Sequence, residues 1–398
     1  MTTVYLKDHE GRGLSAGGCW IYDNEIERIE DLTGPGDLAC VIAANGYRLG
    51  LGYYNPASKI AVRMLTRDAD VEINRDFFRM RIENAISYRE VVTGLENCRL
   101  IFGEADRLPG LTVDKFSDIL VTQTLALGIE RKKEEIFETL LGCLREHGQP
   151  IRGIYERNDA RSRLLEGLER CQGFWRSEFD PCVRICENGL FYDIDVSNGQ
   201  KTGYFLDQRF NRMAIRPLAG NARVLDCFCN AGGFALNALA AGAASALGID
   251  ASEQAVRCAA ENARINGFAD RARFQCADIF ELLPELVQRA EHYDLVILDP
   301  PAFAKSRASV KTAVRGYREI NRRGMQLVRD GGFFATCTCS HFITPDVFED
   351  TIALAARDAH VRLRLIERRA QAPDHPVLLG ANESEYLKFL IFQIQKER

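Results

Sequence analysis

Alternating apolar and helical segments from about residue 190 onward constrain the fold of this chain most. Five apolar runs have the length of a strand and read, in order, ARVLDCF, ALGID, ARFQCADI, YDLVILDPP and GGFFATCTCS. Segments of helical length separate these runs. Strands that are apolar along their whole length and alternate with helices are typical of a parallel sheet that helices cover on both faces. We therefore predict a doubly wound α/β domain in this half of the chain.

The first half of the chain has a different pattern. Residues 1–72 read as short strands rich in β-branched and aromatic residues, with a hairpin signal at Asn45-Gly46. Residues 73–189 combine strand patterns with two helices, the second expected from Lys132 to Gly148. A chain of 398 residues has room for two or three domains. We predict a small β-rich domain over 1–72, a central α+β domain over 73–189 and the α/β domain over 190–398.

Composition is that of a soluble globular protein, with 46% hydrophobic and 27% charged residues. No apolar run approaches the roughly 18–20 residues that a membrane span needs. The N-terminus shows no apolar segment behind a basic one, so no secretory signal is expected. The 13 cysteines are too dilute in so long a chain for a disulfide scaffold. These observations predict a cytoplasmic protein with reduced thiols and no membrane partner.

Charge is unevenly distributed along the chain. The net charge of −5 gives no global argument for a nucleic-acid partner. Between Lys305 and Arg323, however, the chain carries seven basic residues and one acidic residue. Such a run is usually a solvated helix face, so on its own it only permits a polyanionic partner.

The segment from Val224 to Ala243, VLDCFCNAGGFALNALAAGA, joins the first strand of the α/β domain to a helix of small residues. In a doubly wound sheet a nucleotide-like ligand binds at this crossing. Gly232 and Gly233 would let the backbone approach such a ligand, and Asp226 at the strand tip would order the loop. As a glycine fingerprint the segment is weak, because cysteine and phenylalanine occupy positions 227–229, where glycine is expected. An ordinary tight turn is the alternative.

Acidic residues also follow the next three strands. Asp250 ends ALGID, Asp278 ends ARFQCADI, and Asp299 follows the fourth strand. An acid at the end of the second strand can accept hydrogen bonds from both ribose hydroxyls of an adenosine. Asp278 is placed to receive the adenine amino group. Each acid alone would serve equally well as a helix cap, but together, at the carboxyl edge of one sheet, they favour a single site.

This pattern of glycines and acids discriminates between cofactors. A Walker lysine motif is absent, which argues against a nucleotide triphosphatase. A dinucleotide would need the full glycine set around its pyrophosphate. S-adenosylmethionine has an adenosine but no phosphate, and it suits one loop and two acids. We therefore expect S-adenosylmethionine as the cofactor.

Motifs along nearly the whole chain resemble one enzyme family. They are YNPAS (54–58), GEADRLPGLTVDKF (103–116), KTGYFLDQR (201–209), DPPAF (299–303) and DHP (374–376). The chain is similar to the bacterial 23S rRNA cytosine-C5 methyltransferases of the large-subunit methyltransferase I type, which are class I methyltransferases. The resemblance implies an N-terminal PUA domain, a central domain and a Rossmann-like catalytic domain. It also implies that Gln208 and the region of Tyr204 contact the cofactor. Two departures are Cys186–Gly189, where relatives often show an acidic-histidine stretch, and His341, where a small residue is expected.

The chemistry of this family implies roles for the cysteines of CTCSHF, residues 337–342. A thiolate that adds to C6 of cytosine makes C5 nucleophilic enough to accept a methyl group. By resemblance Cys339 is the nucleophile, and Asp299 holds N3 and the exocyclic amine. Many relatives carry a second cysteine, used to release the product, where this chain has Ala302. Either another group removes the C5 proton or Cys337 assists; we favour the former and expect Cys337 to be a small buried residue.

A metal site is not expected at these cysteines. Zinc takes four ligands, and Cys337 and Cys339 supply two. The other closely spaced pair, Cys227 and Cys229, lies on a strand roughly 10 Å away by strand spacing. We therefore predict no metal.

Contacts to RNA follow from the same resemblance. Phe303 is a candidate to stack on a flipped base, with core packing as the alternative. Lys305 and Arg307 begin the basic run beside the crevice, where they would contact phosphates. The expected partner is 23S rRNA or a precursor of the large ribosomal subunit, and the sequence leaves open whether the protein forms a homodimer. Two alternatives are an rRNA purine N-methyltransferase, which needs no cysteine, and a non-catalytic RNA-binding assembly factor.

Overall fold

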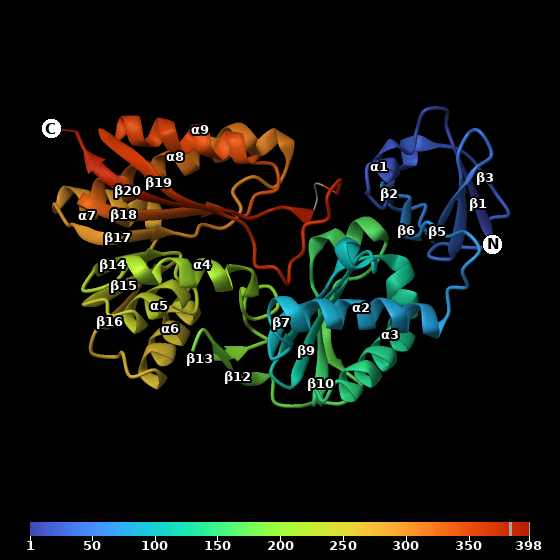
Figure 1. Ribbon diagram of the computed structural model, residues 1–398, viewed down its shortest axis with the longest axis horizontal. Helices are drawn as coiled ribbons and strands as arrows, with labels where there is room; N and C mark the ends of the chain where they lie inside the picture. Colours follow the sequence, from blue (N-terminus) through green and yellow to red (C-terminus); the bar gives the residue numbers. More distant parts are fainter. Residues whose placement is uncertain (382–383, 398) are drawn as a thin grey trace. The chain divides into compact units, whose positions relative to one another are not determined.

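The computed structural model describes residues 1–381 and 384–397, and these residues form two compact units (Figure 1). Unit 1 is built from three segments of the chain, Met1–Val183, Ile194–Asp207 and Pro373–Ser384. Unit 2 contains Arg184–Asp193, Gln208–Ala372 and Glu385–Arg398. Among the described residues, no helix combines the length and the apolar character that a membrane span requires. The boundaries 1–72, 73–189 and 190–398 stay a prediction.

The first sheet of unit 1 has six strands in the order β2-β6-β5-β4-β1-β3. The strands are β1 (Thr2–Leu6), β2 (Trp20–Ile21), β3 (Ile26–Glu30), β4 (Leu38–Ile42), β5 (Arg48–Tyr54) and β6 (Val62–Thr66), with the short helix α1 (Arg12–Ser15) after β1. The β1–β4 pair is parallel and the other pairs are antiparallel. The hairpin predicted at Asn45-Gly46 joins β4 to β5, where Gly46 has a φ of 85°. The β-rich character predicted for this segment is confirmed.

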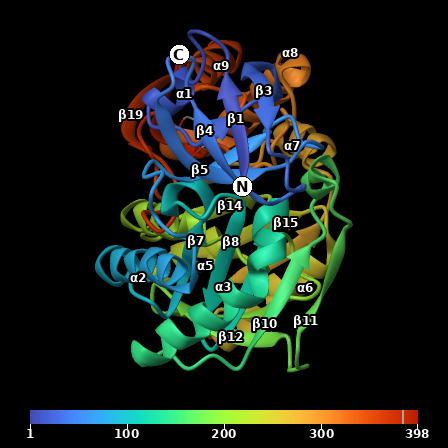
Figure 2. The same ribbon diagram turned by 90° about the vertical axis from the view of Figure 1, so that its right-hand side faces the viewer.

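The second sheet of unit 1 has the order β11-β10-β9-β8-β7 and carries two helices on one face (Figures 1 and 2). The elements are α2 (Arg75–Val92), β7 (Asn97–Phe102), β8 (Leu111–Phe116), β9 (Ile119–Thr124), α3 (Leu127–Glu146), β10 (Gly153–Asn158) and β11 (Cys171–Trp175). The helix predicted from Lys132 begins five residues earlier, at Leu127. The reason is tertiary packing, because Gly128 and Ile129 are buried there. A Cβ atom at Gly128 would lie 2.1 Å from the Tyr53 ring.

A hairpin, β12 (Cys182–Glu187) and β13 (Leu190–Asp195), then leads to unit 2. Unit 2 contains a seven-stranded sheet in the order β16-β15-β14-β17-β18-β20-β19. Its strands are β14 (Arg223–Cys227), β15 (Ser245–Asp250), β16 (Ala272–Cys276), β17 (Tyr293–Leu298), β18 (Val328–Thr338), β19 (Val361–Arg369) and β20 (Lys388–Lys396). The pairs from β16 to β18 are parallel, and β20 is antiparallel to both of its neighbours. The predicted Rossmann-like α/β sheet is confirmed.

Helices cover both faces of this sheet (Figure 1). On one face lie α4 (Arg209–Ala214), α5 (Gly233–Ala240) and α6 (Glu253–Ile265), and on the other lie α7 (Ile279–Gln288), α8 (Val310–Leu327) and α9 (Pro345–Asp358). Nearly the whole of α5 is buried, from Gly233 to Leu239, which explains its run of small and apolar residues. The two glycines that open the fifth apolar run, Gly331 and Gly332, both lie within β18, which begins three residues earlier, and Gly331 has a φ of 78°.

The strand order reverses beside β14. The chain moves from β14 to β15 and β16 on one side, and then returns to add β17 and β18 on the other side. In open α/β sheets this reversal separates the loops at the carboxyl ends of the two central strands, and ligands bind there. The loops that follow β14 and β17 are therefore the first place to look for a site.

Candidate cofactor and substrate site

The loop between β14 and α5 has an unusual backbone. Phe228 and Asn230 have φ angles of 65° and 45°. Residues other than glycine rarely adopt such left-handed conformations, least of all bulky ones, and these conformations cluster at ligand sites. Phe228 thus has the conformation for which a dinucleotide-binding loop uses glycine. The weak glycine fingerprint reflects a loop that makes a similar turn with other residues.

The two glycines of this loop allow close packing. Gly232 is the N-cap of α5 with a φ of 81°, and a Cβ atom there would lie 3.2 Å from Ala259 and from the Phe274 ring. A Cβ atom at Gly233 would lie 2.7 Å from Cδ of Arg212. Arg212 is buried and forms an ion pair with buried Glu187 at 2.8 Å. Gly233 therefore leaves room for this ion pair against the first turn of α5.

Asp226 lies inside β14, one residue before the strand ends, rather than at its tip. Its side chain is fully buried, and its Oδ2 atom accepts a hydrogen bond from the Ala235 amide at 2.9 Å. Asp226 thus holds the start of α5, as predicted for the loop. Its second oxygen is buried and has no hydrogen-bond partner among the described residues. The pKa of Asp226 is raised to about 8, chiefly by burial and to a smaller extent by the nearby carboxylates of Asp299 and Asp250.

Asp250 ends β15, as predicted, and is almost completely buried. Its Oδ2 atom accepts a hydrogen bond from the Asn230 amide at 3.0 Å, and its Oδ1 atom accepts one from the Ser252 amide at 2.9 Å. Asp250 therefore joins the loop after β14 to the start of α6. Each carboxylate oxygen has a second lone pair, so each can accept one more hydrogen bond, for example from the two hydroxyls of a diol.

Asp278 differs from its prediction. The strand β16 ends at Cys276, two residues earlier, and Asp278 is the N-cap of α7. Its Oδ1 atom accepts a hydrogen bond from the Phe280 amide at 2.8 Å, and the residue is exposed. Helix capping, the alternative considered for each acid, is what the structure shows here.

Asp299 follows β17 and lies within a hydrogen-bonded cluster of buried residues. Gln208 donates from Nε2 to its Oδ1 atom at 3.0 Å, and Cys337 donates from Sγ to the same atom at 2.8 Å. Asn211 in turn donates to Oε1 of Gln208 at 2.7 Å. Cys337 is fully buried, as predicted, and burial raises its pKa well above the usual value. It is more than core filling, because its thiol helps to hold the Asp299 carboxylate.

Cys339 lies directly after β18 and is partly buried. The residues on either side of it are anchored to α8. Thr338 donates a hydrogen bond to the Tyr317 hydroxyl at 2.7 Å, and the Ser340 hydroxyl lies 3.0 Å from the same oxygen. Tyr317, which is fully buried, therefore fixes the backbone on both sides of Cys339. Sequence patterns gave no indication of this role.

Lys388 is a second residue that the sequence did not single out. It is the first residue of β20 and pairs with Thr338 of β18. Although buried, it donates hydrogen bonds from Nζ to the carbonyl oxygens of Ser340, at 3.2 Å, and Tyr386, at 3.1 Å. Burial lowers the pKa of Lys388, while a negative charge on Glu385 or Cys339 raises it. The Lys388 amine is therefore hydrogen-bonded to the backbone of the residue that follows Cys339.

Phe303 is partly buried against the aromatic residues of α7 and α8. Its ring centroid lies 4.5 Å from that of Tyr317 and 5.8 Å from that of Phe280. A Cβ atom at Gly316 would lie 3.3 Å from the Phe303 ring. The alternative of core packing thus accounts for at least part of this side chain.

The basic run divides into two groups. Arg318 forms an ion pair with Asp358, and both Arg322 and Arg323 pair with Glu319. The other four basic residues are exposed, and none forms an ion pair with a described residue; they are Lys305, Arg307, Lys311 and Arg315. The unpaired charge is therefore at the start of the run, closest to Asp299 in sequence.

Tyr204 is buried in unit 1, whereas the other candidate site residues belong to unit 2. Among the described residues no group of three or more histidine, cysteine or acidic side chains is arranged to hold a metal ion.

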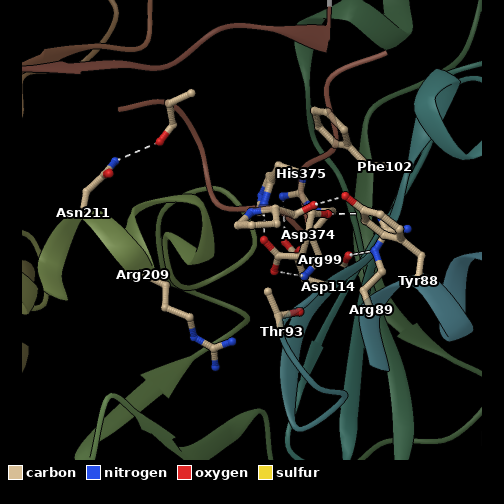
Figure 3. Close-up of polar contacts among 12 residues, drawn as sticks. Tyr88, Arg89, Thr93, Arg99, Phe102, Asp114, Arg209, Asn211, Asp374 and His375 are labelled. Carbon is tan, nitrogen blue, oxygen red and sulfur yellow. Dashed lines mark hydrogen bonds and ion pairs between the residues drawn. The ribbon is translucent and has the colours of Figure 1, made fainter. Parts of the chain in front are cut away.

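Other motif residues form a buried network in unit 1 (Figure 3). Arg89, which is fully buried, binds both oxygens of Asp106 and the carbonyl oxygen of Asp374. Arg99 binds both oxygens of Asp114, and its amide donates to Asp374 at 2.9 Å. His375 lies 2.9 Å from the other oxygen of Asp374. The motifs around Asp106, Asp114 and Asp374 thus hold residues of the third segment of unit 1 to the second sheet.

Comparison with known proteins identifies the family. A family described as S-adenosylmethionine-dependent methyltransferase matches residues 170–393, and a PUA-like domain matches residues 4–67. The ribosomal RNA large subunit methyltransferase I of Photobacterium profundum is 39% identical over 393 residues, which is 97% of this chain and 98% of that protein. The chain belongs to the ribosomal RNA large subunit methyltransferase I family of S-adenosylmethionine-dependent methyltransferases. The resemblance seen in the motifs is confirmed.

Solved structures support the fold. A methyltransferase described as putative, from Streptococcus mutans, has a TM-score of 0.83 at 18% identity and covers 99% of this chain and 100% of its own. A second structure with the same values is described as a putative methyltransferase complexed with S-adenosylhomocysteine (SAH). At this identity the likeness concerns the fold alone.

The residues at the switch point fit the cofactor of this family, S-adenosylmethionine. The decisive observation is the buried Asp226 oxygen that lacks a partner among the described residues, because an unsatisfied buried polar atom is costly and a cationic ligand group beside it would favour the ionised carboxylate that burial disfavours. S-adenosylmethionine carries both an ammonium and a sulfonium group. Asp250 adds an acceptor for a diol on the adjacent strand.

Proposed function

We propose that this methyltransferase modifies C5 of a cytosine in 23S ribosomal RNA, through a covalent bond between Cys339 and C6 of the base. The relatives named as ribosomal RNA large subunit methyltransferases support the class of substrate. The observation that carries the choice of C5 is the position of Cys339. It directly follows β18, the parallel neighbour of β17, and Asp299 follows β17. A thiol and a carboxylate thus come from adjacent strands at one edge of the sheet.

Both groups are needed because C5 of cytosine is a weak nucleophile. The Cys339 thiolate adds its electron pair to C6, and the electrons of the C5–C6 double bond then become available at C5. A proton shared between the Asp299 carboxyl and N3 neutralises the negative charge that develops on the ring, while the same carboxyl accepts a hydrogen bond from the exocyclic amine. The cofactor supplies an electrophilic methyl group. After C5 has been methylated it loses its proton, the double bond forms again, and the thiolate leaves C6.

The surroundings of Cys339 suit this role. A nearby cation favours the thiolate form of a cysteine, and the Lys388 ammonium is the group in that position. Cys337 is not suited to accept the C5 proton, because burial keeps it protonated at neutral pH. Since Ala302 stands at the position of a second cysteine in many relatives, another group takes this proton.

For the cofactor we propose contacts from the switch point and from the segment before α4. The residues are Tyr204, Gln208, Asp226, Gly232, Gly233, Asp250, Asp278 and Asp299. For RNA we propose that Phe303 contacts the target base and that Lys305 and Arg307 contact phosphates. We expect these contacts to form in the cytoplasm, on 23S rRNA or on a precursor of the large subunit.

Methylation of 23S rRNA with labelled S-adenosylmethionine, followed by nucleoside analysis, tests the function. We expect label in 5-methylcytidine. Label in an N-methylated guanosine or adenosine would overturn the proposal in favour of a purine methyltransferase. No label, with intact cofactor binding, would favour an assembly factor. RNA that contains 5-fluorocytosine should trap a cofactor-dependent covalent adduct with the protein, because the C5 fluorine blocks the last step.

A further inference from the structure

A hollow of about 420 Å³ lies in unit 1, far along the sequence from the candidate catalytic residues. Residues of α2 and of the turn after β7 line it, among them Arg81, Tyr88, Asp106, Arg107 and Pro376. The proposed catalytic residues Cys339 and Asp299 belong to unit 2, whereas every residue that lines this hollow belongs to unit 1.

The hollow has two positive charges that no described acidic residue neutralises. Neither Arg81 nor Arg107 forms an ion pair with a described residue. Asp106 also lines the hollow, but both of its oxygens bind the buried guanidinium of Arg89, and one also accepts a hydrogen bond from the Phe102 amide at 2.6 Å. Arg89 thus already balances the negative charge of Asp106, and the positive charges of Arg81 and Arg107 are left without a counter-ion among the described residues.

The guanidinium group of Arg81 is partly buried with few hydrogen bonds, which is energetically unfavourable. Its Nε atom is buried without a hydrogen-bond partner among the described residues, and its Nη2 atom makes only a long bond, 3.4 Å, to the carbonyl oxygen of Leu65. Burial lowers the pKa of Arg81, and the charge of Arg107 lowers it further. Two guanidinium groups that lie close together without a counter-ion, one of them partly desolvated, favour binding of an anion.

A second hollow, of about 250 Å³, shares Arg107 with the first and adds Arg67, which directly follows β6. Arg67 is exposed and forms no ion pair with a described residue. The acid in this hollow, Glu104, is already bound by Arg63 and by the indole nitrogen of Trp20. Three arginines, Arg67, Arg81 and Arg107, therefore line two adjoining hollows with unbalanced positive charge.

We propose that Arg67, Arg81 and Arg107 bind consecutive phosphodiester groups of the RNA substrate. A guanidinium group matches two phosphate oxygens at once, which makes arginine the preferred side chain for this contact. Two adjoining hollows that share one arginine suit a chain of phosphates better than a single small anion. This inference rests on the proposed function, because it takes RNA as the substrate.

The test compares the affinity of full-length variants for 23S rRNA over a range of salt concentrations. Arg81→Gln combined with Arg107→Gln should weaken binding about tenfold at moderate salt, and should reduce the slope of log K against log salt by roughly 1.4, from two lost phosphate contacts. Arg107→Gln alone, at an exposed position, should show about half of the change in slope. Arg75→Gln removes an exposed charge from the same helix, outside both hollows, and should leave affinity and slope unchanged.

The outcomes separate this inference from the proposed function. If both variants keep the RNA affinity and the salt slope of wild type, the inference about the arginines is overturned, even if the enzyme methylates 23S rRNA. A wild-type enzyme that methylates no ribosomal RNA would overturn the proposed function instead. Another outcome is that inorganic phosphate stabilises wild type but not the double variant, while both keep the same affinity for RNA. This result would show that the arginines bind a free anion, and it would also overturn the inference that they bind RNA. An unchanged unfolding transition of the full-length protein should confirm that unit 1 of each variant is folded.

Discussion

The Cys337 thiol donates a hydrogen bond to Oδ1 of Asp299 over 2.8 Å, and Gln208 donates to the same oxygen at 3.0 Å. The carboxylate that we assign to the cytosine ring is therefore held in place before RNA binds. Hydrogen bonds that fix a catalytic group in advance avoid reorganisation during the reaction. The two cysteines of the CTCSHF segment accordingly have different roles, one structural and one chemical.

We expect different results from replacing each cysteine. Cys339→Ala should lower the methylation rate at least about a thousandfold, because the bond to C6 can no longer form. Cys337→Ala removes one hydrogen bond to Asp299, which is worth about 1 kcal/mol, so the rate should fall roughly fivefold. Single-turnover methylation of 23S rRNA measures both. The 5-fluorocytosine adduct should disappear only in the first variant; an adduct that persists there would contradict the assignment of the nucleophile.

Asp226 should make stability depend on pH. Its pKa is about 8 in the folded protein, against 3.8 for an ordinary aspartate. Between these values the folded state holds a proton that the unfolded state has lost. The contribution of Asp226 to the free energy of unfolding is therefore complete below pH 3.8, falls as the pH rises and is lost once the pH has passed through 8. Asp226→Asn removes the titrating group. Between pH 6 and pH 8, the free energy of unfolding of the variant should therefore rise by about 2 kcal/mol relative to that of wild type.

Urea unfolding at pH 6, 7 and 8 checks this expectation. Asp270→Asn is the matched control, because Asp270 is exposed, and its curve should run parallel to that of wild type. A constant difference between Asp226→Asn and wild type over this range would show that Asp226 is ionised in the folded protein.

Cofactor affinity should distinguish Asp250 from Asp278. Asp250→Asn loses a charged acceptor at an almost completely buried position and disturbs its bonds to the Asn230 and Ser252 amides. We expect SAH to bind ten- to hundredfold more weakly, from about 1.5–3 kcal/mol. Asp278 is exposed and an asparagine can keep the helix cap, so Asp278→Asn should weaken SAH binding no more than about fivefold. Calorimetric titration with SAH measures both, and equal losses would contradict the ranking.

Two arginines of α2 should differ in their contribution to stability. Arg89→Ala leaves the Asp106 carboxylate buried and without its ion-pair partner, which should cost about 3–5 kcal/mol. Arg79→Ala is the control on the same helix; its bonds to Glu83 and Glu146 are largely exposed, so the cost should stay below about 1 kcal/mol. Thermal unfolding compares them. Similar melting temperatures for the two variants would mean that the buried network does not stabilise unit 1.

Local patterns in the sequence were sufficient for the five parallel strands of the unit 2 sheet and for its helices, but they did not predict β19 and β20. The central strand β17 is apolar over most of its length because helices cover both faces of the sheet, and such a buried strand can be recognised without knowing its neighbours. The hairpin at Asn45-Gly46 is equally local, since its turn depends on two residues. The start of α3 was predicted too late because contact with Tyr53, distant in sequence, extends the helix.

The candidate site depended more on distant contacts, and here the sequence was less informative. The bond from Cys337 to Asp299 joins residues 38 positions apart, and the one from Gln208 joins residues 91 positions apart. Periodicity places Cys337 in a strand but does not identify this partner. The same holds for Arg318, whose acid, Asp358, lies 40 residues away on another helix. No sequence pattern singled out Lys388, and only the structure shows that it begins β20 and is buried.

The network around Arg89 has a consequence for the order of biosynthesis. Unit 1 contains the first 183 residues, but it also contains Pro373–Ser384, and Asp374 supplies bonds to Arg89 and Arg99. Domains generally fold in the order in which the ribosome releases them. The sheet that contains Arg99 therefore lacks its hydrogen bond to Asp374 until residue 374 has been synthesised and has left the ribosome. Its last stabilising bonds close only when nearly all of unit 2 has emerged from the exit tunnel.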